Sequence, residues 1–354
     1  MTRFRLTRQT RLSLAAAVGF VVLALLIAVL PVPYVIYSPG RAYTVAGLGP
    51  DREPVIRLEG VPTYPVDGEL HMTTVAVTRA DAQTSLAAAI YAYWAPNRDA
   101  LPRDSVYDPG KTTEQVRAEE RQMMDTSQQD ATVAGLRAAG IPVEELPVVS
   151  AVTVSGPSHG QLVPGDLVLS IDGQAIDTPE ELRASIQAHG IGEPLRLRVE
   201  RDRRPLDVEV VTVASTQDPE LPVLGIQIGV GYRYEPTVTF GVSHDIGGPS
   251  AGVVFALAVF DLVTQEDLMR GRSVAGTGKI RPDGRVQAIG GLHEKMAGAE
   301  DVGATIFLVP GENCGDLEGA GTDMQVIRVD TLEDAINGLR HIDDPAAAGQ
   351  VPRC

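Results

Sequence analysis

The residue types and spacing that could do chemistry centre on a serine. Ser250 stands in the string GGPSAG (residues 247–252), directly before the apolar run Val253–Val263, which predicts a buried helix. The start of a helix presents free N–H groups that can bind an oxyanion, so Gly248 and Ala251 are candidate donors. The alternative is that Ser250 merely caps the helix, as serine commonly does.

A lysine 45 positions later has the spacing of a core-facing residue. Lys295 shares one face of a predicted helix with Leu292, Met296 and Ala299, while Glu294 is expected on the opposite side. Burial lowers the pKa of a lysine, and its neutral amine can then act as general base for a nearby serine. The alternative is a snorkelling lysine whose ammonium reaches water. Only three of the thirty basic residues are lysines, which favours a special role.

These motifs, in this order, closely resemble the proteolytic domain of Lon proteases, a Ser–Lys peptidase family. TGKI (277–280), GRV (284–286) and FLVPGEN (307–313) match further segments of that family, and the resemblance covers roughly 225–342. It implies Ser250 as nucleophile and Lys295 as general base, with Thr277 supporting the lysine amine. It also implies assembly into a homo-oligomer, since such domains usually form rings.

Two departures from ATP-dependent Lon matter. Gly247 occupies the position, three residues before the serine, where that enzyme has an acidic residue. No G-x-x-x-x-G-K-[ST] string occurs in the chain, so ATP-driven unfolding by this chain is not expected. The expected substrates are therefore unfolded or flexible protein segments.

Other assignments of the chemistry stay open. His244 with Asp245 could serve Ser250 as a histidine relay, and Lys279 could be proposed as the base, although its turn-rich surroundings should keep it charged. A non-catalytic scaffold on a Lon-like fold is a third possibility. His293-Glu294 is not followed by a histidine at helical spacing, and we expect neither a metal nor a cofactor.

A second domain is predicted upstream. Short β-rich segments at 148–154, 167–171, 195–200 and 206–213 surround one helix at 179–189. The string PGDLVLSIDG (164–173) resembles the PDZ domain of bacterial proteases, which implies binding of extended peptide ends by strand addition. The alternative is a PDZ fold that only spaces or regulates its neighbour. We place this domain at residues 141–215.

The N-terminus predicts a membrane anchor. Residues 14–30 are almost wholly apolar and follow four arginines, so we expect a basic cytoplasmic tail at 1–11, a transmembrane helix at 12–36 and extracytoplasmic domains after it. A cleaved signal peptide is the alternative. With this anchor, the whole chain resembles the membrane-anchored, PDZ-containing Lon-like proteases of Gram-positive bacteria.

The remaining regions complete an α+β multidomain fold. We expect an extracytoplasmic α/β region at 37–140, with strands at 55–58 and 70–77 and helices at 82–93 and 112–140. The charged second helix is expected to be solvated. The proteolytic α/β domain is expected at 216–342 and a tail at 343–354, where Cys354 could pair with Cys314 or leave two free thiols. A formal charge of −16 disfavours nucleic-acid binding.

Overall fold

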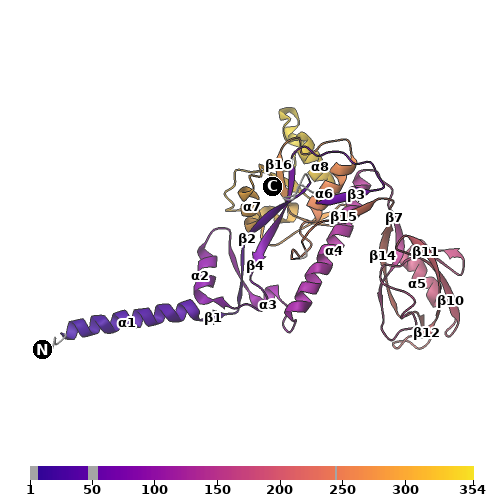
Figure 1. The fold of residues 1–354 in the computed structure, drawn as a ribbon, viewed down its shortest axis with the longest axis horizontal. Coiled ribbons are helices and arrows are strands. Elements are labelled where there is room, and N and C mark those ends of the chain that lie inside the picture. Colours follow the sequence, from indigo (N-terminus) through magenta and orange to yellow (C-terminus); the bar gives the residue numbers. More distant parts are fainter. Residues whose placement is uncertain (1–6, 47–54, 244) are drawn as a thin grey trace. The chain divides into compact units, whose positions relative to one another are not determined.

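The computed structural model describes residues 7–46, 55–243 and 245–354 (Figure 1). They form two compact units: one comprises Met1–Gly140 with Pro236–Cys354, and the other comprises Ile141–Glu235. The second unit is therefore inserted into the first. This division differs from the expected boundaries, because residues 37–140 are not a separate domain and the second unit extends 20 residues beyond 215.

The first unit is built on one mixed six-stranded sheet. Its order is β20-β19-β16-β4-β2-β6, where the strands are β20 (Gln325–Val329), β19 (Ile306–Pro310), β16 (Ser273–Gly276), β4 (Glu69–Val77), β2 (Tyr34–Ala46) and β6 (Asp99–Pro102). The first four run parallel, and β2 is antiparallel to β4 and β6. Strands from both ends of the chain thus share backbone hydrogen bonds, which is why residues 37–140 cannot stand apart.

The buried helix α6 (Gly252–Val263) is the centre of this unit. Helix α4 (Thr113–Ala138) begins close to the expected residue 112, and Thr112 is its N-cap. It packs along α6 (Figure 1). A Cβ at Gly135 would lie 2.7 Å from the Ala256 carbonyl oxygen, so the two helices approach closely. The expectation of a solvated α4 is wrong for its second half, where all six residues from Ala131 to Leu136 are buried.

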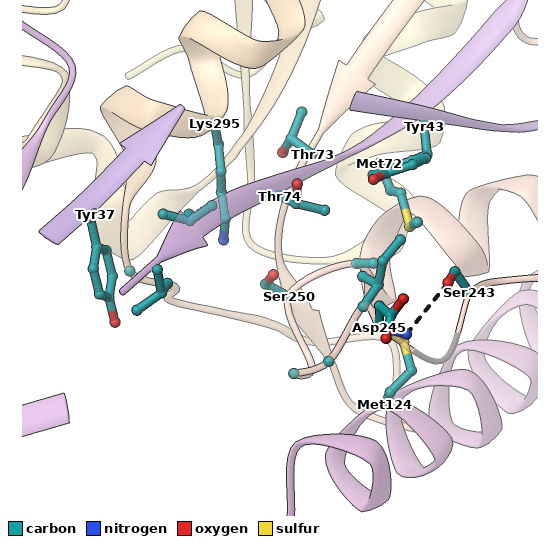
Figure 2. Close-up of a pocket in the computed structure, with 17 residues that line it drawn as sticks. Tyr37, Tyr43, Met72, Thr73, Thr74, Met124, Ser243, Asp245, Ser250 and Lys295 are labelled. Atoms are coloured by element: carbon teal, nitrogen blue, oxygen red, sulfur yellow. Dashed lines mark hydrogen bonds between the residues drawn. The ribbon is translucent and has the colours of Figure 1, made fainter. Parts of the chain in front are cut away.

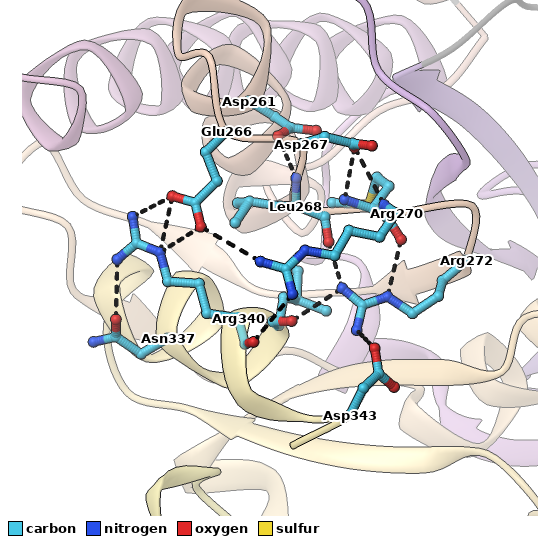
Figure 3. A network of polar contacts seen from close by, with 11 residues as sticks. Asp261, Glu266, Asp267, Leu268, Arg270, Arg272, Asn337, Arg340 and Asp343 are labelled. Carbon is cyan, nitrogen blue, oxygen red and sulfur yellow. Dashed lines mark hydrogen bonds and ion pairs between the residues drawn. The ribbon is translucent and has the colours of Figure 1, made fainter. Parts of the chain in front are cut away.

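A polar network fixes the end of α6 to helix α8 (Leu332–His341) (Figure 3). Arg340 donates to both carboxylate oxygens of Glu266, and Arg272 donates to the Leu268 and Leu339 carbonyls. The buried Asp261 accepts from the Leu268 N–H at 2.9 Å. These bonds join the end of α6 to α8, although the second carboxylate oxygen of Asp261 has no partner among the described residues.

The remaining elements of the first unit are short. They are β3 (Ile56–Glu59) paired with β15 (Thr237–Phe240), β17 (Lys279–Ile280) paired with β18 (Val286–Gln287), α3 (Arg103–Val106), α7 (Leu292–Asp301), η1 (Gly311–Leu317) and η2 (Pro345–Gln350). A disulfide joins Cys314 to Cys354.

The N-terminal helix α1 spans Arg8–Val29, and none of its residues is buried. It is long and apolar enough to cross a membrane. The expected span of 12–36 is wrong at its end, because Pro31 begins the two-residue strand β1 (Pro31–Val32) and β2 starts at Tyr34. Prolines lack the N–H that a continuing helix would require. The strand β1 pairs with β5 (Thr84–Ser85), which leads into helix α2 (Leu86–Trp94).

The second unit is a small β-rich domain around α5 (Pro179–Gln187). Its main sheet has the order β11-β10-β8-β7-β14, with β7 (Glu144–Val152), β8 (Leu167–Ile171), β10 (Pro194–Arg201), β11 (Arg204–Val211) and β14 (Ile226–Arg233); β9 (Gln174–Ala175), β12 (Val213–Ala214) and β13 (Pro222–Val223) are minor strands. The four predicted strands and the helix occur close to their expected ranges. The predicted domain omitted β14, however, because this strand lies beyond the expected boundary. In the structure β14 pairs with β7 along its whole length.

Candidate active site

Ser250 and Lys295 line the same cavity of ≈ 480 Å³. Ser250 comes from the turn before α6 and Lys295 from α7, and Figure 2 shows the lysine amine and the serine hydroxyl both directed into that space. The opposite wall comes from β2 and β4, including Tyr37 and Thr74. Residues far apart in the sequence therefore meet around one nucleophile candidate and one base candidate.

The backbone around Ser250 is held by bonds from neighbouring elements. The Ser250 carbonyl accepts from the Thr277 hydroxyl at 3.0 Å and from the Gly278 N–H at 2.7 Å. The preceding Pro249 carbonyl accepts from the Ser127 hydroxyl of α4 at 3.1 Å. These bonds fix the turn and leave the serine side chain itself uncommitted.

The capping alternative for Ser250 is not what the structure has. The N-cap of α6 is Ala251, and no side chain caps this helix. Within the described part of the chain, the Ser250 hydroxyl makes no hydrogen bond. Its oxygen is thus available to the cavity.

Of the two expected oxyanion donors, Gly248 and Ala251, only Ala251 has a free N–H group among the described residues. The Gly248 N–H donates to the Glu120 carbonyl of α4 at 3.0 Å, and Gly248 adopts a left-handed φ of 87°, so this amide is already committed. Among the described residues, the N–H groups of Ser250 and Ala251 have no hydrogen-bond partner. Two adjacent free amides at the start of a buried helix can bind a developing oxyanion.

Lys295 is 3 % exposed, so the snorkelling alternative does not hold. Burial lowers the pKa of its ammonium to about 8, while Coulombic attraction from Glu294 opposes this effect. Within the described residues its amine makes no hydrogen bond or ion pair. An amine without a partner in such surroundings readily loses its proton.

Glu294 is a correction to the sequence analysis. It was expected opposite the core-facing side of α7, but it is 1 % exposed and its two carboxylate oxygens have no hydrogen-bond partner among the described residues. Burial raises the pKa of this carboxyl. Helical periodicity missed it because α7 contacts β2 as well as β4, so that more than one face of the helix is covered.

Thr277 has a different contact from the one expected. Its hydroxyl donates to the Ser250 carbonyl, and it makes no bond to the lysine within the described residues. Lys279 is exposed, as its turn-rich surroundings predicted. Asp245 lines the cavity, whereas His244 lies outside the described residues.

Several lining residues were not foreseen from the sequence. Met72, Thr73 and Val75 of β4, Tyr37 of β2 and Met124 of α4 all border the cavity. Nothing in the sequence around these residues indicates a site. They reach the cavity only because β4 pairs with β16 and α4 packs on α6. Gly247, where Lon has an acid, lies against Glu120: a Cβ there would be 2.6 Å from that residue's Cβ.

Comparisons with known proteins agree with this architecture. Residues 242–339 match the family described as Lon protease (S16) C-terminal proteolytic domain, and residues 122–212 match the PDZ domain family. The second match begins within α4, whereas the structural unit runs from Ile141 to Glu235.

Individual relatives match over short regions. Lon protease 2 of Herpetosiphon aurantiacus is 38% identical over 113 residues, which are 31% of this chain and 13% of that protein. Lon protease of Clostridium beijerinckii is 38% identical over 102 residues, 28% of this chain and 13% of that protein. The chain thus spans about an eighth of the length of these curated relatives.

Among solved structures, the PDZ domain of the SdrC-like protein from Listeria monocytogenes is 22% identical, covers 23% of this chain and 85% of that one, and has a TM-score of 0.22. The chain therefore carries a Lon-type C-terminal proteolytic domain and a PDZ domain.

Proposed function

We propose that this protein is a membrane-anchored, ATP-independent serine endopeptidase with a Ser250–Lys295 dyad. The observation that carries the proposal is a lysine with a pKa lowered to about 8 by burial in the same cavity as an uncommitted serine hydroxyl. Neutral lysine can activate a serine without histidine or aspartate. The Lon-type domain match supports peptidase chemistry.

The reaction follows from these groups. Lys295 takes the proton of the Ser250 hydroxyl as its oxygen attacks the scissile carbonyl, and the free amides of Ser250 and Ala251 stabilise the oxyanion. Lys295 then gives the proton to the leaving amine as the C–N bond breaks. Water, deprotonated by the same amine, hydrolyses the acyl-enzyme and restores the serine.

The setting of the reaction is part of the proposal. Helix α1 supports a single-pass anchor, and the arginines before it favour a cytoplasmic N-terminus with extracytoplasmic domains. Without an ATP-binding loop on this chain, the expected substrates are unfolded or flexible extracytoplasmic segments. Resemblance to Lon-type domains favours a homo-oligomer.

Cleavage of an unfolded protein tests the dyad. The full chain, solubilised in detergent, is offered casein alongside Ser250→Ala, Lys295→Met and His244→Ala variants, and the new amine termini are counted. We expect cleavage by the wild type and by His244→Ala but not by the other two. Equal cleavage by all four would reject the dyad, and no cleavage by the folded wild type would favour the non-catalytic scaffold.

The PDZ unit supports a second function, peptide capture. A groove of ≈ 730 Å³ lies between α5 and β14, lined by Arg183, Ile186 and Ile228 among others. Strand β14 ends the order of the main sheet in the described residues, so a peptide could add beside it. Fluorescence anisotropy with a C-terminally free peptide library tests this. Binding that survives Ile186→Glu would refute this groove.

A further inference from the structure

Helix α2 exposes an unusual set of side chains. Its nine residues, LAAAIYAYW, include no charged residue. Ala89 and Ala92 are buried against the rest of the unit. The large side chains instead face outward, with exposed fractions of 47% for Ile90, 64% for Tyr91, 73% for Tyr93 and 79% for Trp94. Small residues thus pack inward and aromatic ones outward, the reverse of a water-facing helix.

Helix α2 is tied to the end of α1. The N–H of Leu86, its first residue, donates to the carbonyl of Leu30 at 2.8 Å, directly after α1 ends. The strands β1 and β5 extend this junction through the pairs Pro31–Ser85 and Val32–Thr84. Figure 1 shows α2 standing beside β1, where the chain leaves α1. The position of α2 is therefore set by the end of the apolar helix.

A basic residue accompanies the aromatic face. The Arg98 guanidinium lies 5.7 Å from the centre of the Tyr91 ring and donates to the Ser38 hydroxyl at 2.7 Å. A cation beside tyrosine and tryptophan suits the headgroup layer, where phosphates lie next to the first acyl carbons.

We propose that α2 is an interfacial helix whose outward face (Ile90, Tyr91, Tyr93 and Trp94, the aromatic face) lies in the headgroup–acyl boundary of the membrane that α1 crosses. The inference rests on the proposed anchoring by α1. At 1.5 Å per residue, the uncharged part of α1 from Leu12 to Val29 extends about 27 Å, close to a hydrocarbon core of ~30 Å. The junction at Leu30 then lies at the membrane surface, and α2 with it.

The junction of α2 with the end of α1 favours lipid over protein as the partner of the aromatic face. Tyrosine and tryptophan concentrate at membrane–water boundaries because one end of each ring is apolar and the other hydrogen-bonds to water. A second α2, or another protein, would have to reach this face at the surface of the bilayer. Coverage by protein is accordingly an outcome that the test must recognise.

The chain contains a single tryptophan, so its fluorescence reports on Trp94 alone. The full chain is reconstituted into phosphatidylcholine–phosphatidylglycerol vesicles, with and without lipids brominated near the headgroup end of their acyl chains. Flotation of the vesicles after an alkaline wash measures anchoring by α1 independently. A control variant, Trp94→Phe with Tyr64→Trp, moves the reporter to the loop before β4, at the end of that strand away from its pairing with Tyr37.

We expect the chain to float, and brominated lipid to reduce Trp94 emission by at least about twofold while the aqueous quencher acrylamide has little effect. The Tyr64→Trp control should behave in the opposite way. A floating chain whose Trp94 is quenched by acrylamide and not by bromine would overturn the inference and leave the anchor intact. Shielding from both quenchers would also overturn it, in favour of a protein occupant. Failure to float would overturn the anchor and this inference together.

Discussion

Replacing Lys295 by methionine should abolish peptidase activity and at the same time stabilise the protein. Methionine has a similar length and no charge, so it fills the space of a side chain that is 3 % exposed. The ammonium, by contrast, is largely withdrawn from water by burial. The candidate active site thus carries an unfavourable free energy that the variant removes.

The expected gain in the free energy of unfolding follows from the pKa of Lys295. A folded-state value of about 8 against the ordinary 10.5 corresponds to about 3 kcal/mol at neutral pH, at about 1.4 kcal/mol per unit. Because the folded value lies below the unfolded one, the unfolded state binds more protons between the two. The wild type therefore gains stability as the pH rises from about 8 to about 10.5, and the difference from the variant shrinks over that range.

The same pKa predicts how the activity of the proposed dyad depends on pH. At pH 7 roughly a tenth of a lysine with a pKa of about 8 is neutral, against about 0.03 % for an ordinary lysine. If the neutral amine is the base, kcat/KM should rise about 90-fold between pH 6 and pH 9 and then level off.

Pulse proteolysis with thermolysin across a urea gradient measures the free energy of unfolding of the detergent-solubilised chain at pH 7 and at pH 10. Peptide hydrolysis is followed over pH 5–10. Lys279→Met is the matched control, since it makes the same change at an exposed lysine, and we expect it to alter neither measurement.

Two results would refute this reasoning. One is a Lys295→Met variant that is no more stable than the wild type at pH 7, which would mean that the buried amine is not destabilising. The other is a wild-type rate that stays flat from pH 5 to pH 9, which would mean that no group of this pKa must lose its proton.

Three further changes test the supporting structure. Thr277→Val removes the bond to the Ser250 carbonyl, so kcat should fall while the midpoint of the acid limb stays in place; a shifted midpoint would show that the threonine serves the lysine instead. Cys354→Ser removes the disulfide to Cys314, which lies 40 residues away in the sequence. Urea titration should show that the free energy of unfolding falls by about 4 kcal/mol, as expected from the chain entropy of the open loop. Gly135→Val places a side chain where a carbonyl of α6 lies 2.7 Å from the new Cβ, and should lower the melting temperature and the activity together, by about 1–3 kcal/mol in stability; an unchanged melting temperature would contradict the close approach of α4 and α6.

The sequence by itself predicted the local elements and the two candidate catalytic residues. Periodicity placed the helix after Ser250 and put Lys295 on a core-facing side, because both depend only on residues a few positions apart. The apolar N-terminal stretch, the start of the helix near residue 112 and the PDZ strands were visible for the same reason.

Only the tertiary structure decided how distant segments combine. It placed β4 beside β16 in the sheet, with β2 next to β4. It buried Glu294, because α7 packs against β2 as well as β4. It also paired the Gly248 N–H with a carbonyl of α4. These outcomes depend on pairing and packing between residues more than a hundred positions apart. Such contacts are selected by the burial of whole faces, and no local pattern in the chain encodes them.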